Sequence, residues 1–279
     1  MMAAGSSSAL CAPSVAKRAR SVTIEIGSIP ILLRSSHEKF CAMVEQRYAN
    51  FLNPSATPVY QFEMQIETPS EPSEEDARVS RDGSRWIFER GDFRAGWDTR
   101  SRQGWVRQSA NPYSIDTVLR ICHSLALAEK GGFLVHAASA VRGGSAFVFA
   151  GVSGAGKTTI SRVAPRDATF LTDEISYIRP DEAGYRAYGT PFAGEMGRAG
   201  ENMSAPLKAL YFLEKGPENR IEPVERAQAV RELMRHILFF AHDADLVKRV
   251  FDAALDFVSR ARVERLVFTP DARAWELIR

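Results

Sequence analysis

Residues Ala146–Thr159 read AFVFAGVSGAGKTT, and this stretch carries the strongest structural signal in the chain. Its first part, Ala146–Ala150, is wholly apolar, which predicts a strand buried in the middle of a sheet. The residues Gly151–Thr158 then fit the pattern G-x-x-x-x-G-K-[ST] at every position. A short helical pattern, Lys157–Arg162, follows and stops before Pro165. A strand, a glycine-rich loop and a helix in this order predict an α/β fold.

The loop has the chemistry of a nucleotide phosphate site. Glycines let the backbone turn so that N–H groups point inward at phosphate oxygens, and the following helix adds its positive N-terminal end. Lys157 supplies a charge for the β- and γ-phosphates, and the Thr158 hydroxyl is a ligand for Mg²⁺. The sequence therefore predicts that the chain binds ATP with Mg²⁺. The residues expected to contact the nucleotide are Gly151, Ser153, Gly154, Ala155, Gly156, Lys157, Thr158 and Thr159.

Two carboxylates follow the next expected strand. Ala168–Thr172 reads as that strand, so Asp173 and Glu174 stand at its C-terminal end, which faces the ligand crevice in an open parallel sheet. One carboxylate can then hold Mg²⁺ while the other accepts the proton of a substrate hydroxyl, although a solvated strand end explains the same residues. Glu195, in a later Gly/Pro-marked turn, can join the metal or the substrate, or be a surface acid. His136 ends the strand before Ala146–Ala150, where a lone His is more often a core residue than a catalyst.

The chain before residue 131 predicts a smaller, β-rich α+β domain. Val22–Ile26 and Ile29–Leu33 read as strands, and Pro30 places the second at a sheet edge. Ser36–Leu52 is amphipathic and reads as a helix capped by Ser36. Three short alternating runs separated by turns predict an antiparallel meander: Arg85–Glu89, Phe93–Trp97 and Gly104–Arg107. Its tryptophans are expected to fill the core, with a binding face as the alternative: Trp86, Trp97 and Trp105.

A helix is expected to link this domain to the α/β part. Ser114–Lys130 has apolar residues on one face and is stopped by Gly131-Gly132. Further on, Val224–Phe240 and Asp243–Ala261 read as helices, and Thr269 is expected to cap a last short helix. Further strands are expected at Phe133–His136, Tyr185–Tyr188, Leu207–Leu213 and Val263–Phe268. Arg198, in a loop, is a candidate for stabilising charge on a transferring phosphate.

Composition and charge exclude several classes of protein. The chain has 279 residues with 36 Lys and Arg against 34 Asp and Glu, a formal net charge of +2. This balance argues against a protein that coats nucleic acid or an anionic membrane, and no stretch reaches the roughly 20 apolar residues of a membrane span. Cys11, Cys41 and Cys122 are widely spaced without a CxxC pair, which favours a cytoplasmic location over a disulfide framework or zinc site. Neither nucleic acid nor membrane is an expected partner.

Three regions are expected along the chain. Residues 1–20 form a disordered tail, residues 21–130 a substrate- or partner-recognition domain, and residues 131–279 the nucleotide-binding domain. In the tail the basic residues follow the apolar ones, the reverse of a secretory signal, although its composition also suits an organelle transit peptide. The acidic, Pro-containing run Thr68–Ala77 is expected to be a loop.

Three segments together resemble the catalytic domain of bacterial HPr serine kinases, which is itself similar to the nucleotide core of ATP-dependent phosphoenolpyruvate carboxykinase. The segments are His136-Ala-Ala, Phe147–Thr159 and Leu171–Glu174, and the resemblance extends over roughly residues 131 to 215. It implies a P-loop kinase core, in which a central mixed sheet is flanked by helices. It further implies that Asp173 is the general base toward the acceptor hydroxyl and that His136 lies beside the transferred phosphoryl group.

The same resemblance assigns the charged groups around the phosphates. Lys157 would hold the β- and γ-phosphates, and Thr158 the Mg²⁺ ion. Glu174 stands where the family usually has a second Asp and can still ligate Mg²⁺; Glu195 is a further metal candidate. The C-terminal phosphorylase loop of those enzymes is not recognisable, which makes HPr a doubtful substrate. Gly189–Glu195 is more similar to divergent relatives, some of which phosphorylate ribosomal peptide precursors.

The expected function is that of an ATP- and Mg²⁺-dependent kinase. It would transfer the γ-phosphate to a hydroxyl acceptor, which is Ser or Thr of a protein or peptide, or a small molecule. A nucleotide-regulated binding module is the first alternative, with the meander recognising the partner. A carboxykinase-type lyase is the second, although the chain is short for that enzyme. Assembly of a homo-oligomer is left open.

Overall fold

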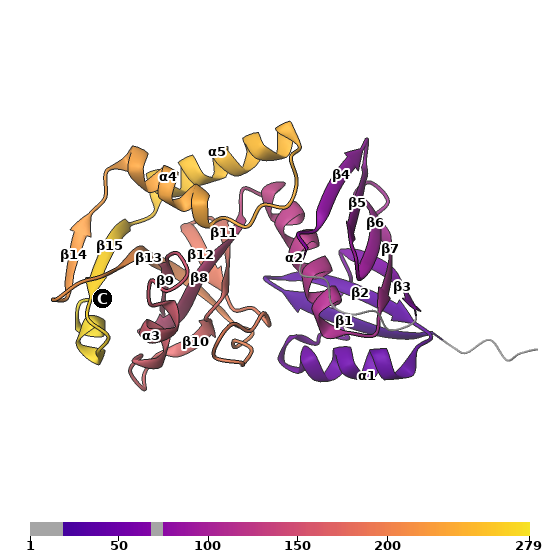
Figure 1. Ribbon diagram of the computed structural model, residues 1–279, viewed down its shortest axis with the longest axis horizontal. Coiled ribbons are helices and arrows are strands. Elements are labelled where there is room, and N and C mark those ends of the chain that lie inside the picture. The colour runs from indigo at the N-terminus through magenta and orange to yellow at the C-terminus, as the bar shows by residue number, and fades with distance from the viewer. Residues whose placement is uncertain (1–18, 68–74) are drawn as a thin grey trace, which may run out of the picture.

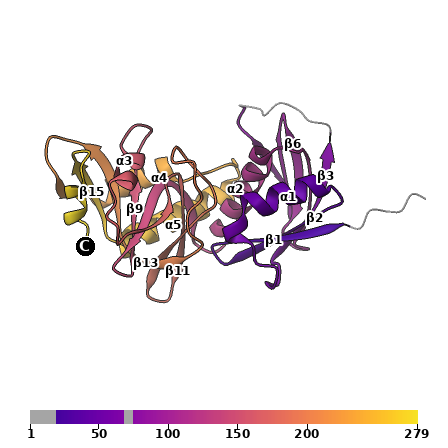
Figure 2. The ribbon, with the colours of Figure 1, turned by 90° about the horizontal axis from the view of Figure 1, so that it is seen from below.

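A computed structural model gives the fold, and it describes residues 19–67 and 75–279 (Figure 1). Within these residues the chain forms two mixed β-sheets, of seven and eight strands. The first sheet has the strand order β1-β2-β3-β7-β6-β5-β4 and the second contains β8 to β15. Helix α2 lies between the two sheets and contacts strands of both (Figures 1 and 2). The expected α/β class, with mixed sheets and a few flanking helices, is confirmed.

The first sheet contains the expected meander and the two expected N-terminal strands, together with two strands, β3 and β4, that the sequence did not suggest. Strands β5, β6 and β7 pair antiparallel with one another, as the alternating runs predict. The sheet is mixed because β3 runs parallel to both β2 and β7. The elements are β1 (Arg20–Ile26), β2 (Ile29–Ser35), α1 (Glu38–Arg47), the 3₁₀-helix η1 (Ala49–Phe51), β3 (Tyr60–Glu67), β4 (Arg78–Asp82), β5 (Arg85–Arg90), β6 (Phe93–Asp98) and β7 (Gln103–Ser109).

Two expectations for the first strands and helix are wrong. Strand β2 is not at an edge but lies between β1 and β3. It tolerates Pro30 because pairing with β3 begins only at Ile31, so the missing N–H lies before that ladder. Helix α1 is shorter than expected and is capped not by Ser36 but by His37, whose Nδ1 accepts a hydrogen bond from the Phe40 amide at 3.1 Å.

The tryptophans of the meander divide between core and surface. Trp86 and Trp97 are buried, as expected. Trp105 is only partly buried and lies under the Arg107 guanidinium, 5.5 Å from its ring centroid. Residue 96 is a glycine because a Cβ there would lie 2.6 Å from the Trp105 Nε1 atom. The core expectation is therefore correct for two of the three rings.

Helix α2 (Pro112–Ala128) joins the two sheets through one continuous hydrophobic core. Its predicted apolar face is buried at every named position: Ile115, Val118, Leu119, Cys122, Leu125 and Ala126. The helix packs against β7 and α1 on one side and against β8 and α5 on the other. It ends where Gly131 takes a positive φ of 70°. The helix that was expected to be a linker is therefore a central part of the packing.

The second sheet closes on itself. Its elements are β8 (Phe133–Arg142), β9 (Ser145–Ala150), α3 (Lys157–Arg162), β10 (Thr169–Thr172), β11 (Ile175–Asp181), β12 (Gly184–Tyr188), β13 (Ser204–Lys215), β14 (Arg220–Pro223) and β15 (Val263–Phe268). Pairing runs from β8 through β11, β12 and β13 to β9 and back to β8. The sheet is mixed, as the resemblance implies, but it is closed, unlike the open parallel sheet that the reasoning about Asp173 and Glu174 used.

The direction of the strands still places the expected site residues at one edge. Strands β9 and β10 both run antiparallel to β8, so they run in the same direction, and β13 is parallel to β9. The buried strand before the phosphate loop is central, since β9 pairs with β8 on one side and β13 on the other. The C-terminal ends of β9, β10 and β13 consequently lie at the same edge of the sheet.

The C-terminal helices differ from the sequence expectation at their ends. Helix α4 (Arg226–His236) stops before Ile237, which instead forms a β-bridge with Val135. Helix α5 (Ala244–Arg260) buries one apolar stripe: Leu246, Val250, Ala253, Ala254 and Phe257. The last short helix is the 3₁₀-helix η2 (Ala272–Glu276), capped by Asp271 rather than Thr269. Within the described parts of the chain, no helix is both long and apolar enough to cross a bilayer.

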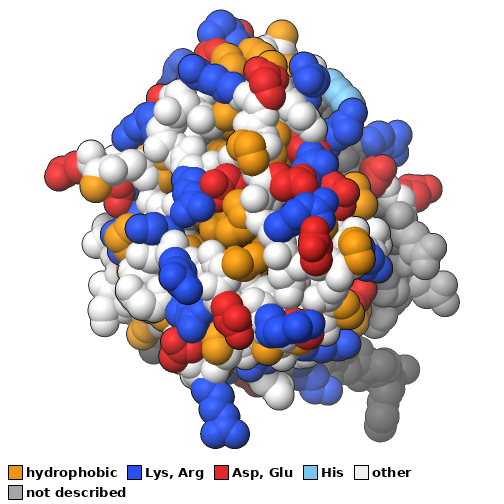
Figure 3. Space-filling model, turned by 90° about the vertical axis from the view of Figure 1, so that its left-hand side faces the viewer, with side chains coloured by type: hydrophobic (Ala, Val, Ile, Leu, Met, Phe, Trp, Pro, Cys, Tyr) orange, Lys and Arg blue, Asp and Glu red, His pale blue; other side chains and the backbone are white. Residues whose placement is uncertain are grey.

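The surface is mixed in charge. On the face drawn in Figure 3, basic and acidic side chains alternate, with apolar side chains between them. Cys41 and Cys122 are buried free thiols. The expected tail at residues 1–20 lies almost wholly outside the described residues, and so do Cys11 and most of the expected acidic loop Thr68–Ala77.

Candidate functional site

The glycine-rich loop connects β9 to α3, as the sequence predicts. Gly154 and Gly156 have φ values of 77° and 111°, which are left-handed conformations that glycine adopts without strain. Gly156 is also the N-cap residue of α3. A Cβ at this position would lie 2.5 Å from Cζ of Phe268, so the loop and β15 require glycine there. The glycines thus let the backbone turn sharply before α3, so that the N–H groups of the first helical turn lie next to the loop.

Lys157 folds back onto its own loop. Its Nζ donates hydrogen bonds to the carbonyl oxygens of Gly151, at 2.9 Å, and Val152, at 3.3 Å. Burial lowers the pKa of Lys157, and the nearby carboxylates of Glu174 and Glu195 oppose this shift. The ammonium group is therefore held among neutral carbonyls with acids nearby, where an anionic phosphate would be a stronger partner.

Thr158 and Glu195 are in contact, although they are far apart in the sequence. The Thr158 hydroxyl donates a hydrogen bond to Oε2 of Glu195 at 2.8 Å. A hydroxyl and a carboxylate oxygen side by side are the kind of ligands that Mg²⁺ takes in proteins. This contact brings two of the three predicted metal ligands together.

Asp173 is bound on both sides by the backbone of the 194–196 loop. Its Oδ1 accepts a hydrogen bond from the Gly194 amide at 3.0 Å, and its Oδ2 from the Met196 amide at 2.8 Å. The residue is only 2% exposed. Residue 194 must be small, because a Cβ there would lie 2.8 Å from Oε2 of Glu174. Asp173 therefore holds the loop that carries Glu195, and each of its oxygens keeps one lone pair free of these amides.

Glu174 pairs with His136. The Nε2 of His136 lies 3.3 Å from Oε1 of Glu174, and both side chains are partly exposed. The hydrogen bond from His136 is the main cause that lowers the pKa of Glu174; the charges of Arg120 and Lys157 add to it and burial opposes it. His136 is thus a site residue and not the buried core histidine that a lone His on an apolar strand usually is.

These groups surround one cavity of about 660 Å³. It brings together nearly all of the predicted site residues: Ser153, Gly154, Gly156, Lys157, Thr158, Thr159, Asp173, Glu174, Glu195 and His136. Gly151 and Ala155 do not line it; Gly151 supplies its carbonyl to Lys157, and Ala155 is buried under the loop. Arg198 is also elsewhere, with its guanidinium 4.2 Å from the centroid of the Phe170 ring in a different cavity.

Sequence reasoning missed two basic residues of this cavity. Arg120 comes from α2 and Lys215 from the end of β13. No motif marks either residue, because both reach the cavity through tertiary packing. Arg120 also lines a second, adjacent cavity of about 380 Å³, whose walls include Thr117, Arg90, Phe239 and His242.

The cavity suits a nucleotide that brings its own metal ion. Among the residues that the structure describes, no three His, Cys, Asp or Glu side chains gather as a ready-made metal site. Mg²⁺ at a phosphate site needs only one or two protein ligands, since phosphate oxygens and water supply the others. Thr158, Glu195 and Glu174 meet that requirement, so the residues fit Mg²⁺ bound together with ATP.

The model of the SynChlorMet cassette protein ScmC matches residues 109–277, more than half of the chain. The chain belongs to the ScmC family. The match runs from the end of β7 to beyond η2 and includes α2, the phosphate loop and every acid of the cavity. No curated protein matches the chain.

Proposed function

We propose that the protein is an ATP- and Mg²⁺-dependent kinase that transfers the γ-phosphate to a hydroxyl acceptor. The observation that carries this proposal is that the phosphate loop and the acids line the same cavity. The loop contributes Lys157 and Thr158, the end of β10 contributes Asp173 and Glu174, and β8 contributes His136. A phosphate loop alone supports nucleotide binding, whereas acids beside it support transfer to a hydroxyl.

In this proposal the backbone and one lysine bind the triphosphate. The N–H groups at the start of α3 and the ammonium of Lys157 neutralise charge on the β- and γ-phosphates. The hydrogen bonds of Lys157 to loop carbonyls would be exchanged for bonds to phosphate oxygens. Mg²⁺, held through Thr158 with Glu195 or Glu174, supplies further charge neutralisation when it is bound.

A carboxylate takes the proton of the acceptor hydroxyl. The hydroxyl oxygen forms a bond to the γ-phosphorus as the bond to the bridging β,γ-oxygen breaks, and ADP leaves. Asp173 is the base that the resemblance to HPr serine kinases implies. The geometry equally supports Glu174, which is less buried and is oriented by His136. The two variants Asp173→Asn and Glu174→Gln separate these assignments.

The residues that line the cavity do not identify the hydroxyl acceptor. ScmC is described as a protein of the SynChlorMet cassette, which supports a search among products of the genes next to the one encoding this chain. Peptides and proteins with accessible Ser or Thr are the first class to test, and small hydroxyl compounds the second.

The test is phosphate transfer from γ-labelled ATP with Mg²⁺ to each product of the neighbouring genes. We expect one acceptor to be labelled, and Lys157→Met to abolish the labelling. Lys208→Met, which changes an exposed lysine on β13, is the control and should label the acceptor as the wild type does. A wild-type protein that binds MgATP but labels no acceptor would favour the nucleotide-regulated binding module. Failure to bind MgATP would exclude both the kinase and the nucleotide-regulated binding module.

A further inference from the structure

Arg120 is a partly buried cation that forms no ion pair with a described residue. Its Nε atom is buried and has no hydrogen-bond partner, and within residues 19–67 and 75–279 its guanidinium makes no ion pair. The guanidinium instead lies over the ring of Phe192, 5.0 Å from its centroid. A buried polar group without a partner is costly in a folded protein, so an unpaired guanidinium in a cavity wall indicates a bound anion.

Arg120 lines the same cavity as Lys157 and Glu174, and the three charges influence one another. Burial is the main cause that lowers the pKa of Arg120, and the carboxylates of Asp116 and Glu174 oppose that shift. Glu174 in turn is influenced by both Arg120 and Lys157. Because these three residues line one cavity, a phosphate bound there by Lys157 has Arg120 as a further cation on the cavity wall. Guanidinium groups bind phosphate oxygens through two parallel N–H groups, which a lysine cannot do.

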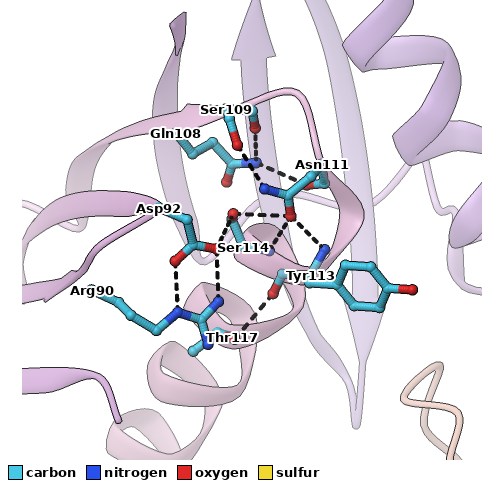
Figure 4. A network of polar contacts seen from close by, with 8 residues as sticks. All are labelled: Arg90, Asp92, Gln108, Ser109, Asn111, Tyr113, Ser114 and Thr117. Carbon is cyan, nitrogen blue, oxygen red and sulfur yellow. Dashed lines mark hydrogen bonds and ion pairs between the residues drawn. The ribbon is translucent and has the colours of Figure 1, made fainter. Parts of the chain in front are cut away.

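Helix α2, which carries Arg120, is fixed at its N-terminus by a network of polar contacts, which Figure 4 shows. The Asn111 side chain caps the helix by accepting hydrogen bonds from the Tyr113 and Ser114 amides, both at 2.9 Å. Asp92 of the first sheet accepts a hydrogen bond from the Ser114 hydroxyl at 2.7 Å and pairs with Arg90. Burial raises the pKa of Asp92, but the hydrogen bonds from Arg90 and Ser114 outweigh it and hold the pKa below its usual range.

A second anchor lies one turn before Arg120. The carboxylate of Asp116 is buried and accepts hydrogen bonds from Arg47, at 3.0 Å from Nε, and from the Tyr48 hydroxyl. Asp116 is thereby hydrogen-bonded by residues of the first half of the chain, and it influences Arg120 only through its charge, without an ion pair. The helix is fixed while the guanidinium four residues later stays available.

We propose that Arg120 binds the terminal phosphoryl group of the nucleotide and stabilises it during transfer. The inference rests on the proposed kinase function and adds a site residue to it, supplied by the helix between the sheets and not by the loop or its following strands. Lys157 and Arg120 would then hold the phosphoryl group from two sides, with Glu174 near both.

The test compares two nucleotide probes in the full-length protein by calorimetry. MgADP measures binding of the nucleotide without a terminal phosphoryl group, and MgADP with aluminium fluoride adds a mimic of the group in transfer. We expect Arg120→Met to bind MgADP within about twofold of the wild type but to bind the fluoride complex at least tenfold more weakly. Arg120→Lys should fall between the two, because a lysine keeps the charge but not the paired donors.

The matched control is Arg198→Met, which removes another arginine stacked on an aromatic ring, in a different cavity. It should bind both probes as the wild type does. Equal binding of the fluoride complex by Arg120→Met and wild type would overturn the inference, and so would an equal loss for both probes. If the wild type binds MgADP but the fluoride adds no affinity in any variant, the inference also fails. If the wild type binds neither probe, it is the kinase function itself that fails.

Discussion

The substitution Asp173→Asn is expected to destabilise the protein as well as to affect chemistry. Both carboxylate oxygens of Asp173 accept backbone N–H groups, from Gly194 and from Met196. An asparagine offers one oxygen and one NH₂ group, so in either orientation an N–H donor faces one of the two amides. One charge-assisted hydrogen bond is lost and two donors are left opposed in a region where Asp173 is 2% exposed.

The size of the effect follows from these contacts. A hydrogen bond to a charged group contributes about 1.5–3 kcal/mol, and an unsatisfied buried donor costs about 1–3 kcal/mol. We expect a loss of about 3 kcal/mol in the free energy of unfolding. For a chain of this size, that lowers the melting temperature by roughly 6–10 °C. The loop with Glu195 should loosen first, because these two hydrogen bonds hold it.

Glu174→Gln is the matched substitution, since it removes the neighbouring carboxylate with the same change of charge. The glutamine oxygen can still accept a hydrogen bond from His136, and the pair is partly exposed. Its cost should stay below about 1 kcal/mol. Urea unfolding and calorimetric melting of the two variants give the comparison. A melting temperature of Asp173→Asn within 1 °C of the wild type would refute the anchoring role of Asp173.

Three further outcomes are expected. Gly156→Ala should destabilise the protein by about 1–3 kcal/mol more than Gly154→Ala in chemical unfolding, because both positions have positive φ but only the first lacks room for a Cβ. His123 is buried with its pKa lowered to about 3, so it stays neutral in the folded state while the unfolded chain binds a proton below pH 6.5. Between these pH values, its contribution to the free energy of unfolding falls by about 1.4 kcal/mol for each pH unit that the pH falls. His123→Phe should remove this pH dependence from the free energy of unfolding. Arg47→Met should cost roughly 3 kcal/mol, because it leaves the buried Asp116 carboxylate without its cation.

Controls and contrary outcomes are available for each of the three. Equal stability of the two glycine variants would show that Phe268 moves aside at no cost. An unchanged pH slope in His123→Phe would assign the acid sensitivity to another group, and His236, with a pKa lowered by burial to about 4, is the first to test. Arg20→Met breaks the exposed pair with Glu45 and should cost less than about 1 kcal/mol. A similar cost for Arg20→Met and Arg47→Met would contradict the burial argument.

Local patterns in the sequence predicted the parts of the fold that depend on neighbouring residues. The strand, loop and helix around Gly151–Thr158 form as expected, and so does the apolar face of α2, because periodicity and glycine placement act within one element. Strand β11, which begins directly after Glu174, forms a tight hairpin with β12, and this local signal was overlooked. Its other partner, β8, lies far away in the sequence and could not be read from local patterns. The closure of the second sheet was missed for the same reason.

Most of the candidate site was predictable, but its electrostatics were not. The loop motif and the two acids after β10 named most of the groups around the cavity. The different contacts of the two acids could not be predicted, because they form only in the folded chain. Asp173 accepts hydrogen bonds from two backbone amides, whereas Glu174 pairs with His136. Arg120 could not be predicted either, because it lies on α2 and reaches the cavity of the second sheet only through tertiary packing.

The second cavity, which Arg120 also lines, is formed by residues from inside and from outside the segment that the ScmC model matches. Arg120 and Thr117 lie within residues 109–277, which the ScmC family model matches, whereas Arg90 precedes that segment. A change in the first sheet can therefore reshape this cavity while leaving the phosphate loop and the acids of the first cavity in place. We expect relatives of this chain to differ more at Arg90 than at Arg120 and Thr117.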